Sequence, residues 1–295
     1  MTACIVGWHH LPFARHEGRD VESLIVEAAS GAIIDAGIAP ADVDSIYLGH
    51  FNGGCATGSA AVHAGLRAIA AGEARLVLVV GVEKMTELAG PAIGDTLLKA
   101  SYLKEEEGIA GGFAGVFGQI AQSYFQRYGD QSDALATIAA KNHKNGVANP
   151  WAQMRKDLGF EFCRAVSEKN PVVAGPLKRT DCSLVSDGAA ALVLADVPTA
   201  LGMPKEAMGL TPRGQGAKAA LEGWTQKDGR LPVNPSGGLK AKGHPIGATG
   251  VSMHVLTAMQ VRGEAGEMQV KDARIGGVYN MGGACVASYV SLLEA

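Results

Sequence analysis

The segment from Arg75 to Val82 is almost wholly apolar, and it constrains the fold of this chain more than any other stretch. A strand that is apolar on both faces is expected inside a parallel sheet that helices cover. Segments with the periodicity of helices and of strands alternate on either side of it. This alternation predicts an α/β fold built in layers.

Local patterns predict where the elements of this fold begin and end. Asp20 is expected to cap a helix that Gly37 ends, and Gly72 is expected to close a helix of small residues. The expected strands span Ala3–Trp8, Asp44–Gly49, Arg75–Val82, Val185–Asp196 and Arg274–Tyr279.

Residues from about 85 to 180 interrupt the alternation, because this stretch combines the Gly-rich patch Gly108–Gly118 with helical patterns. We interpret it as a helical insertion between strands. The predicted organisation is therefore an N-terminal half (1–85), an inserted loop domain (86–180), the end of the N-terminal half (181–200) and a C-terminal half (201–295).

Composition indicates which side chains build the core and which classes of partner are excluded. Glycine accounts for 40 of 295 residues, roughly twice its ordinary share, whereas aromatic residues make up only 5%, so aliphatic and alanine side chains should pack backbone close to backbone. A net charge of −3 offers no basic field for nucleic acid, and the apolar runs are far shorter than the ~20 residues of a membrane helix. Five cysteines, an odd number, favour unpaired thiols in a reducing compartment. We expect a cytoplasmic protein that binds neither nucleic acid nor membrane.

A faint internal repeat relates the two halves. Cys55 precedes a helix that ends in Gly-Glu-Ala (72–74) and leads to a strand. His244 precedes a similar helix that ends in Gly-Glu-Ala (263–265) and also leads to a strand. The two reactive side chains are thus predicted at equivalent positions, each just ahead of a helix.

Cys55 is a candidate nucleophile because glycines precede it and a helix follows it. The helix dipole is expected to lower the pKa of the thiol. Backbone N–H groups are expected to hold the oxyanion that forms when the thiolate attacks a thioester. The alternative is a buried small hydrophobic residue, which is what most free cysteines are.

His244 is a candidate base, since glycines and prolines fix the loop from Asn234 to Gly250 that presents it. The alternative is a histidine in an ordinary turn. Farther along, the turn that contains Asn280 and Gly282 is expected at a third side of the pocket, with a plain glycine hairpin as its alternative. No metal site is expected, because no histidine or cysteine pair has metal-type spacing. For Lys240 and Lys242 a solvated basic face is favoured over phosphate binding.

The loop around His244 reads Asn-x-x-Gly-Gly followed by Gly-His-Pro-x-Gly-x-x-Gly and resembles the signature of the thiolase family. Cys-Ala-Thr-Gly-Ser-Ala-Ala (55–61) is similar to the nucleophile motif of that family, and Ser-Asp-Gly-Ala-Ala (186–190) is similar to another of its stretches. The resemblance runs almost from end to end. It is closest to the branch related to the thiolase domain of sterol carrier proteins, whose members are often described as acetyl-CoA acetyltransferases.

The resemblance implies a duplicated βαβαβαββ fold in α-β-α-β-α layers, with an inserted loop domain over the pantetheine arm of coenzyme A. It implies an acyl-CoA substrate, no resident cofactor, and a homodimer or homotetramer. By position, Cys55 would become acylated and His244 would activate it, while the N–H groups of Cys55 and Gly282 would form an oxyanion hole. Relatives in this branch pair with small OB-fold, zinc-ribbon proteins, so such a protein is a candidate partner.

The sequence departs from the family pattern in two ways. Asn280 stands where thiolases carry a second reactive cysteine, and the His-Asp-Cys-Phe motif that compensates in the sterol-carrier branch does not occur. A helix and a strand expected before Cys55 are also missing, as is a segment near Ala200. Loss of a central strand would expose unpaired backbone. Three interpretations stay open: the sequence leaves out segments of a longer chain, the protein is a shortened natural or engineered variant, or it is a degenerate relative that binds without turnover.

The leading hypothesis is a thiolase-type acyl-CoA acyltransferase, an acetyl-CoA acetyltransferase or 3-ketoacyl-CoA thiolase, that works through an acyl-cysteine. One alternative is a non-catalytic protein that binds coenzyme A or lipid, with an OB-fold subunit as its partner. A decarboxylating ketoacyl-synthase-like enzyme is a third hypothesis, and the Gly-His-Pro loop argues against it.

Overall fold

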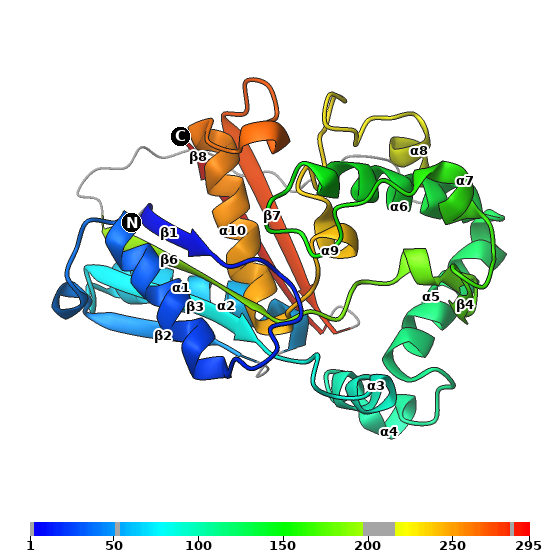
Figure 1. The fold of residues 1–295 in the computed structure, drawn as a ribbon, viewed down its shortest axis with the longest axis horizontal. Helices are drawn as coiled ribbons and strands as arrows, with labels where there is room; N and C mark the ends of the chain where they lie inside the picture. Colours follow the sequence, from blue (N-terminus) through cyan, green and yellow to red (C-terminus); the bar gives the residue numbers. More distant parts are fainter. Residues whose placement is uncertain (1–2, 51–53, 197–215, 284–285) are drawn as a thin grey trace.

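The computed structural model describes residues 3–50, 54–196, 216–283 and 286–295, and it arranges them in layers (Figure 1). The first part contains β1 (Ala3–His10), α1 (Val21–Asp35), β2 (Ser45–Gly49), the 3-10 turn η2 (Gly54–Ala56), α2 (Thr57–Ala71) and β3 (Leu76–Glu83). The inserted part contains α3 (Gly90–Leu98), α4 (Leu103–Glu106), α5 (Gly112–Tyr128), α6 (Ser132–Val147), α7 (Gly159–Arg164), β4 (Val172–Ala174) and β5 (Leu177–Lys178). The rest contains β6 (Gly188–Asp196), α8 (Gly216–Leu221), α9 (Gly238–Ala241), α10 (Ile246–Arg262), β7 (Ile275–Gly282) and β8 (Ala287–Glu294).

The main sheet has the strand order β1-β6-β3-β2, and β3 lies inside it as its sequence predicts. The expected parallel sheet is wrong in one respect. β2 and β3 run parallel, but β6 runs antiparallel to both β1 and β3, so the sheet is mixed. Full coverage by helices, rather than strand direction, makes β3 apolar on both faces.

Alternate side chains of β3 enter two different cores. Leu78, Val80 and Val82 pack against α1, whereas Val77 and Val79 face α2 and α10 on the other side of the sheet. The β7–β8 ribbon packs on the side of α10 that faces away from the main sheet (Figure 1). The described residues thus supply the layers α1, sheet, α2 with α10, and ribbon.

The sheet is continuous, so no central strand is missing from it. β2 is bonded only to β3 and forms an edge. A strand lost between β2 and α2 would therefore have lain at an edge of this sheet, beside β2 or β1, where its absence leaves no gap in the core. Gly54 and Cys55 are consecutive residues of η2, whereas the second expected gap, near Ala200, lies outside the described residues.

The predicted helix boundaries agree closely with the structure. The Asp20 carboxylate accepts a hydrogen bond from the Ser23 N–H at 2.8 Å and caps α1. Gly72 and Gly263 end α2 and α10, each in the left-handed region with φ of 75°. The faint repeat therefore corresponds to two helices with the same cap. Among the described residues, no helix is long and apolar enough to cross a bilayer.

Close contact of α2 with α10 explains part of the high glycine content. Gly58 of α2 lies against Gly247 and Gly250 of α10, and a Cβ at Gly58 would lie only 2.7 Å from the Gly247 carbonyl oxygen. Gly81 of β3 faces the same carbonyl, at 2.6 Å from such a Cβ. Any side chain at these positions would push the helices apart.

Gly58→Ala is expected to destabilise the protein by about 1–3 kcal/mol, because the added methyl meets backbone atoms that cannot rotate away. Gly94→Ala is the matched control, since a Cβ there meets no atom within 4 Å in helix α3. Urea unfolding followed by circular dichroism would measure both. Equal midpoints for Gly58→Ala and the parent would contradict the close crossing.

Two buried histidines are neutral in the folded protein. His254 Nδ1–H donates to the Gly250 carbonyl at 2.7 Å, and its Nε2 accepts from the Ser291 hydroxyl of β8 at 2.8 Å. Burial lowers the pKa of His254 to about 4 and that of His10 to about 3, from an ordinary 6.5. Between pH 6.5 and 4 the unfolded chain therefore binds more protons than the folded chain.

The free energy of unfolding should consequently fall as the pH is lowered from about 6.5 toward 4. Urea titrations at several pH values would measure the slope, and the upper part of the window, above about pH 5.5, lies beyond the range where ordinary carboxylates titrate. His254→Gln should make the slope shallower. A free energy that is constant across the window would show that these histidines are not held neutral.

Candidate active site

Cys55 lies in η2, immediately ahead of α2 and half-buried. Gly54 adopts a positive φ of 66°, and the Thr57 hydroxyl donates to the Gly54 carbonyl at 2.8 Å, which closes the turn. The backbone N–H groups of Cys55 and Gly283 both interact with the sulfur. The thiol therefore has an oriented set of donors around it.

Burial raises the pKa of the Cys55 thiol, and the two N–H groups offset that effect only in part. The expected lowering of this pKa by the helix dipole is thus wrong. Removing the sulfur from water penalises the thiolate more than the donors at the helix start stabilise it. A neutral thiol at rest needs a base to remove its proton.

His244 stands just before Pro245, which caps α10, and it is 8% exposed. Its N–H donates to the Ser186 hydroxyl at 3.1 Å, which ties the histidine loop to the segment just before β6. Burial lowers the pKa of His244 to about 4, and the charge on Lys242 adds to this effect. The imidazole is therefore neutral near pH 7.

Thr249 fixes which ring nitrogen of His244 carries the proton. The Thr249 hydroxyl donates its only hydrogen to the Pro245 carbonyl at 2.9 Å. At 2.7 Å from the same hydroxyl, His244 Nδ1 must donate to the oxygen. Nε2 is left with its lone pair and can accept a proton.

The crossing of α2 and α10 brings the two candidates to the same region. Gly58 and Gly247, in the first turns of the two helices, are in backbone contact, so the residues just ahead of both helices are neighbours. Gly49 at the end of β2 packs against Gly58 and Gly247 as well. Cys55 and His244 are therefore both placed near the C-terminal ends of strands β2 and β3.

Asn280 of β7 completes the arrangement around Cys55. Its amide Nδ2 donates to the Cys55 carbonyl at 3.0 Å, and its Oδ1 accepts from the Ser59 hydroxyl at 2.9 Å. Both ends of the side chain are thus engaged, which indicates a positioning role. Gly282 is buried at the end of β7, and the N–H that interacts with the Cys55 sulfur belongs to the next residue, Gly283.

Sequence reasoning missed Glu83, a buried carboxylate at the end of β3. Its Oε2 accepts from the Gly247 N–H in the first turn of α10 at 3.3 Å, and its Oε1 lies 3.2 Å from His50 Nδ1. Burial raises the pKa of Glu83, although His50 opposes this. The only available signal was an acidic residue directly after an apolar strand.

The expectation of a solvated basic face fails for two lysines. Lys240 and Lys242 are 8% and 2% exposed. Lys240 Nζ donates to the carbonyls of Arg179 and Cys182, and burial lowers its pKa to about 8. Both lysines belong to the loop that leads to His244, so they stabilise the loop from inside.

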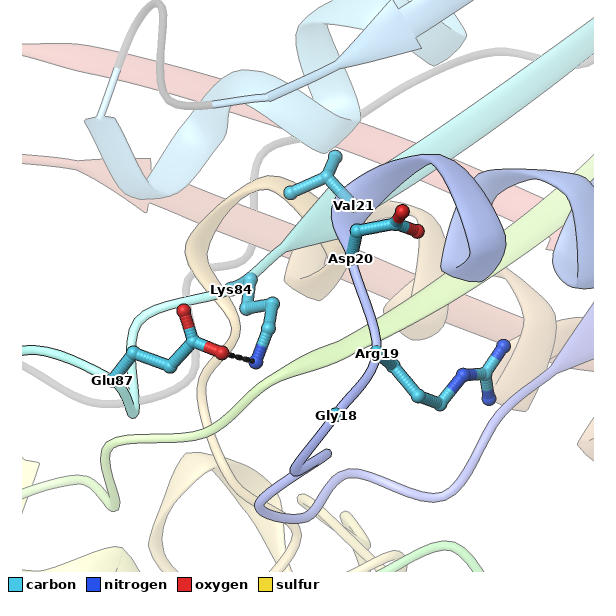
Figure 2. Close-up of a pocket in the computed structure, with 6 residues that line it drawn as sticks. All are labelled: Gly18, Arg19, Asp20, Val21, Lys84 and Glu87. Carbon is cyan, nitrogen blue, oxygen red and sulfur yellow. Dashed lines mark ion pairs between the residues drawn. The ribbon is translucent and has the colours of Figure 1, made fainter.

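Two cavities in the described part of the chain are lined by residues other than Cys55. One, of about 460 Å³, lies at the start of α1, where Lys84 forms an ion pair with Glu87 at 2.8 Å (Figure 2). The other, of about 280 Å³, lies between α6 and the loop that leads to His244. It is lined by Asn142 and Asp181, each with one buried side-chain oxygen that has no hydrogen-bond partner among the described residues.

Comparison with known proteins matches most of the chain to models of one family. A family model described as "Thiolase, N-terminal domain" matches residues 50–158, and one described as "Thiolase C-terminal domain-like" matches residues 191–295. Together they take in more than two thirds of the chain.

Individual relatives agree with these matches. The chain is 29% identical to an acetyl-CoA acetyltransferase of Methanothermobacter thermautotrophicus, over 95% of this chain and 96% of that protein. It is 27% identical to human sterol carrier protein 2, over 90% of this chain and 66% of that protein. The first alignment spans 372 positions, more than the 295 residues of this chain, so the relative carries segments that have no counterpart here.

Among solved structures, one titled "Ltp2-ChsH2(DUF35) aldolase" matches with a TM-score of 0.76 and 19% identity, over 99% of this chain and 97% of that chain. An identity this low speaks for the fold alone. The two family models, the relatives and the shared fold lead to one conclusion: the chain is a shortened member of the thiolase family.

Proposed function

We propose that the protein is a thiolase-type acyl-CoA acyltransferase in which Cys55 carries the acyl group and His244 is the base. The observation that carries this proposal is the fixed tautomer of His244. Its Nδ1 proton is committed to Thr249, so the basic Nε2 is free. The first turn of α10 then holds this base next to the turn that contains Cys55.

The acylation step follows from these groups. His244 Nε2 takes the proton of the Cys55 thiol as the sulfur attacks the thioester carbonyl carbon. The carbonyl oxygen becomes an oxyanion, and the N–H groups of Cys55 and of the Gly282–Gly283 turn are the donors available to stabilise it. When the intermediate collapses, the C–S bond to coenzyme A breaks and the leaving thiolate recovers the proton from His244. The products are acyl-Cys55 and free coenzyme A.

The loop domain supplies a candidate binding site for the substrate arm. The cavity between α6 and the His244 loop combines apolar side chains, such as Leu135 and Ile138, with polar ones, such as Thr180 and Ser183. Hydroxyl groups of this kind can bond to the amide groups of a pantetheine chain. We assign coenzyme A here the role of substrate carrier, with no resident cofactor.

Formation or cleavage of a carbon–carbon bond needs a second acid–base group. Asn280 occupies the position of the second thiolase cysteine, and both ends of its amide are already bonded. Acylation is therefore the half-reaction that the site supports best. The competing proposal, a protein that binds coenzyme A or lipid without turnover, predicts binding with no acyl adduct.

We propose in addition that the chain works as an oligomer or with a second subunit. The fold neighbour titled "Ltp2-ChsH2(DUF35) aldolase" joins two named components, which supports an OB-fold partner of the kind that the family resemblance implies. Exposed Ile46 and Leu48 on the edge strand β2 offer an apolar surface for such contacts.

Incubation with acetyl-CoA should add the mass of one acetyl group to the peptide that contains Cys55. Cys55→Ala should abolish the adduct, whereas Cys4→Ala should retain it, because Cys4 is exposed and lies in β1. Mass spectrometry of the intact and digested protein measures this. Binding of coenzyme A without an adduct would favour the non-catalytic proposal.

Thr249→Val should slow acylation by roughly tenfold or more, since the hydroxyl that holds the His244 tautomer is removed while the shape is kept. Single-turnover mass spectrometry would give the rate. Thr137→Val is the control, because the Thr137 hydroxyl bonds only to the Asp133 carbonyl on the exposed face of α6. An unchanged rate in Thr249→Val would refute the assigned tautomer.

A further inference from the structure

Lys242 is a buried amine that the acylation step does not use. Its side chain is 2% exposed, and its Nζ donates to the Ser252 hydroxyl of α10 at 2.8 Å. Among the residues that the structure describes, no carboxylate forms an ion pair with it. A charge in such a place is costly, because neither water nor an anion compensates it.

The hydrogen bonds around Lys242 have a fixed direction. His10 Nδ1–H donates to the Leu11 carbonyl at 2.7 Å, which leaves His10 Nε2 as an acceptor. The Ser252 hydroxyl donates to this Nε2 at 2.6 Å, so its oxygen is free to accept from Lys242. Lys242, Ser252 and His10 therefore form one chain of donors that ends on a backbone carbonyl.

Groups from each neighbouring element define the surroundings of the amine. β1 contributes His10, and the segment after β1 contributes the Phe13 ring, whose centroid lies 5.3 Å from Nζ. The Trp151 ring lies tilted against His10, and α10 contributes Ser252. The titratable groups that feel the charge of Lys242 are His10 and His244.

Lys242 and His244 are coupled through a short, rigid connection. Only Gly243 separates them, with φ of 107° and no room for a Cβ beside the Ser186 hydroxyl. The carbonyl of Lys242 also accepts from the Gln153 N–H at 3.1 Å. The amine is therefore held at a constant place relative to the imidazole.

We propose that Lys242 is a positioning residue that controls His244 electrostatically: the charged amine opposes proton transfer from Cys55 to His244, and the neutral amine permits it. This inference rests on the proposed roles of Cys55 and His244. It follows from a buried cation that lacks an anion and lies two residues from the base. Loss of the lysine proton removes the repulsion that an imidazolium would meet.

Lys242 should lose its proton near neutral pH, since burial lowers the pKa of its amine to about 7. Below that pH the amine is charged and His244 is a poor base. Above it the amine is neutral and His244 accepts the thiol proton more readily. The reactivity of Cys55 should therefore rise through an inflection near pH 7, below the range in which the thiol itself ionises.

Alkylation of Cys55 by iodoacetamide tests this without any acyl-CoA, so the outcome is independent of whether acyl transfer occurs. The rate is read by mass spectrometry of the peptide that contains Cys55, across the range from about pH 5.5 to 8.5. Lys242→Met should lose the inflection and react about tenfold faster than the parent at the acidic end. Ser252→Ala should move the inflection to lower pH, because the amine loses its acceptor.

Lys240→Met is the matched control. Lys240 is a buried lysine of the same loop, and it bonds to the carbonyls of Arg179 and Cys182 instead of Ser252. Its variant should keep the inflection. A Lys242→Met profile that superimposes on that of the parent would overturn the proposal.

A measurement on the unmodified protein covers the case in which Lys242→Met fails to fold. The ring signals of His244 in NMR spectra should shift in two steps, one from its own protonation and one near pH 7 from Lys242. A single step, with no change near pH 7, would equally overturn the proposal.

Discussion

The backbone contact between α2 and α10 is the constraint on which the rest of the structure depends. Gly58 meets Gly247 and Gly250 so closely that a methyl group would not fit between the helices. Cys55 lies just ahead of α2 and His244 just ahead of α10, so the same crossing that fills the space between sheet and ribbon also places the two candidate residues at the same end of the helix pair. The packing of the core and the placement of the two candidate residues therefore depend on the same helix contact. This helix contact is opposed by the conformational entropy that the glycines lose on folding.

Burial determines the electrostatics of this site more than helix dipoles do. It raises the pKa of Cys55 and lowers those of His244 and Lys242, so each of the three groups favours its neutral form. Cys55, His244 and Lys242 therefore form no ion pair with one another in their neutral forms. Hydrogen bonds to Thr249 and Ser186 orient His244, and a hydrogen bond from the Asn280 amide holds the Cys55 carbonyl.

The short chain still builds a continuous sheet, because its four strands are hydrogen-bonded in unbroken order. Both faces of β3 remain covered, by α1 on one side and by α2 with α10 on the other. The exposed part is the periphery: the free edge of β2 and the outer face of the β7–β8 ribbon, where Ile275, Tyr279 and Leu292 are exposed. The main sheet and the helices on both of its faces are thus present in the described residues, although the family pattern is shortened.

Local sequence determined the elements and the candidates. The apolar run before Glu83, the caps at Asp20, Gly72 and Gly263, and the glycine-rich settings of Cys55 and His244 are visible in short windows, because they depend on propensity and spacing. Only the tertiary structure decided the antiparallel direction of β6, the buried state of Lys242, the link of Asn280 to the Cys55 carbonyl and the rise in the pKa of the thiol. These properties arise between residues that are far apart in sequence, and desolvation depends on everything that surrounds a group once the chain has folded.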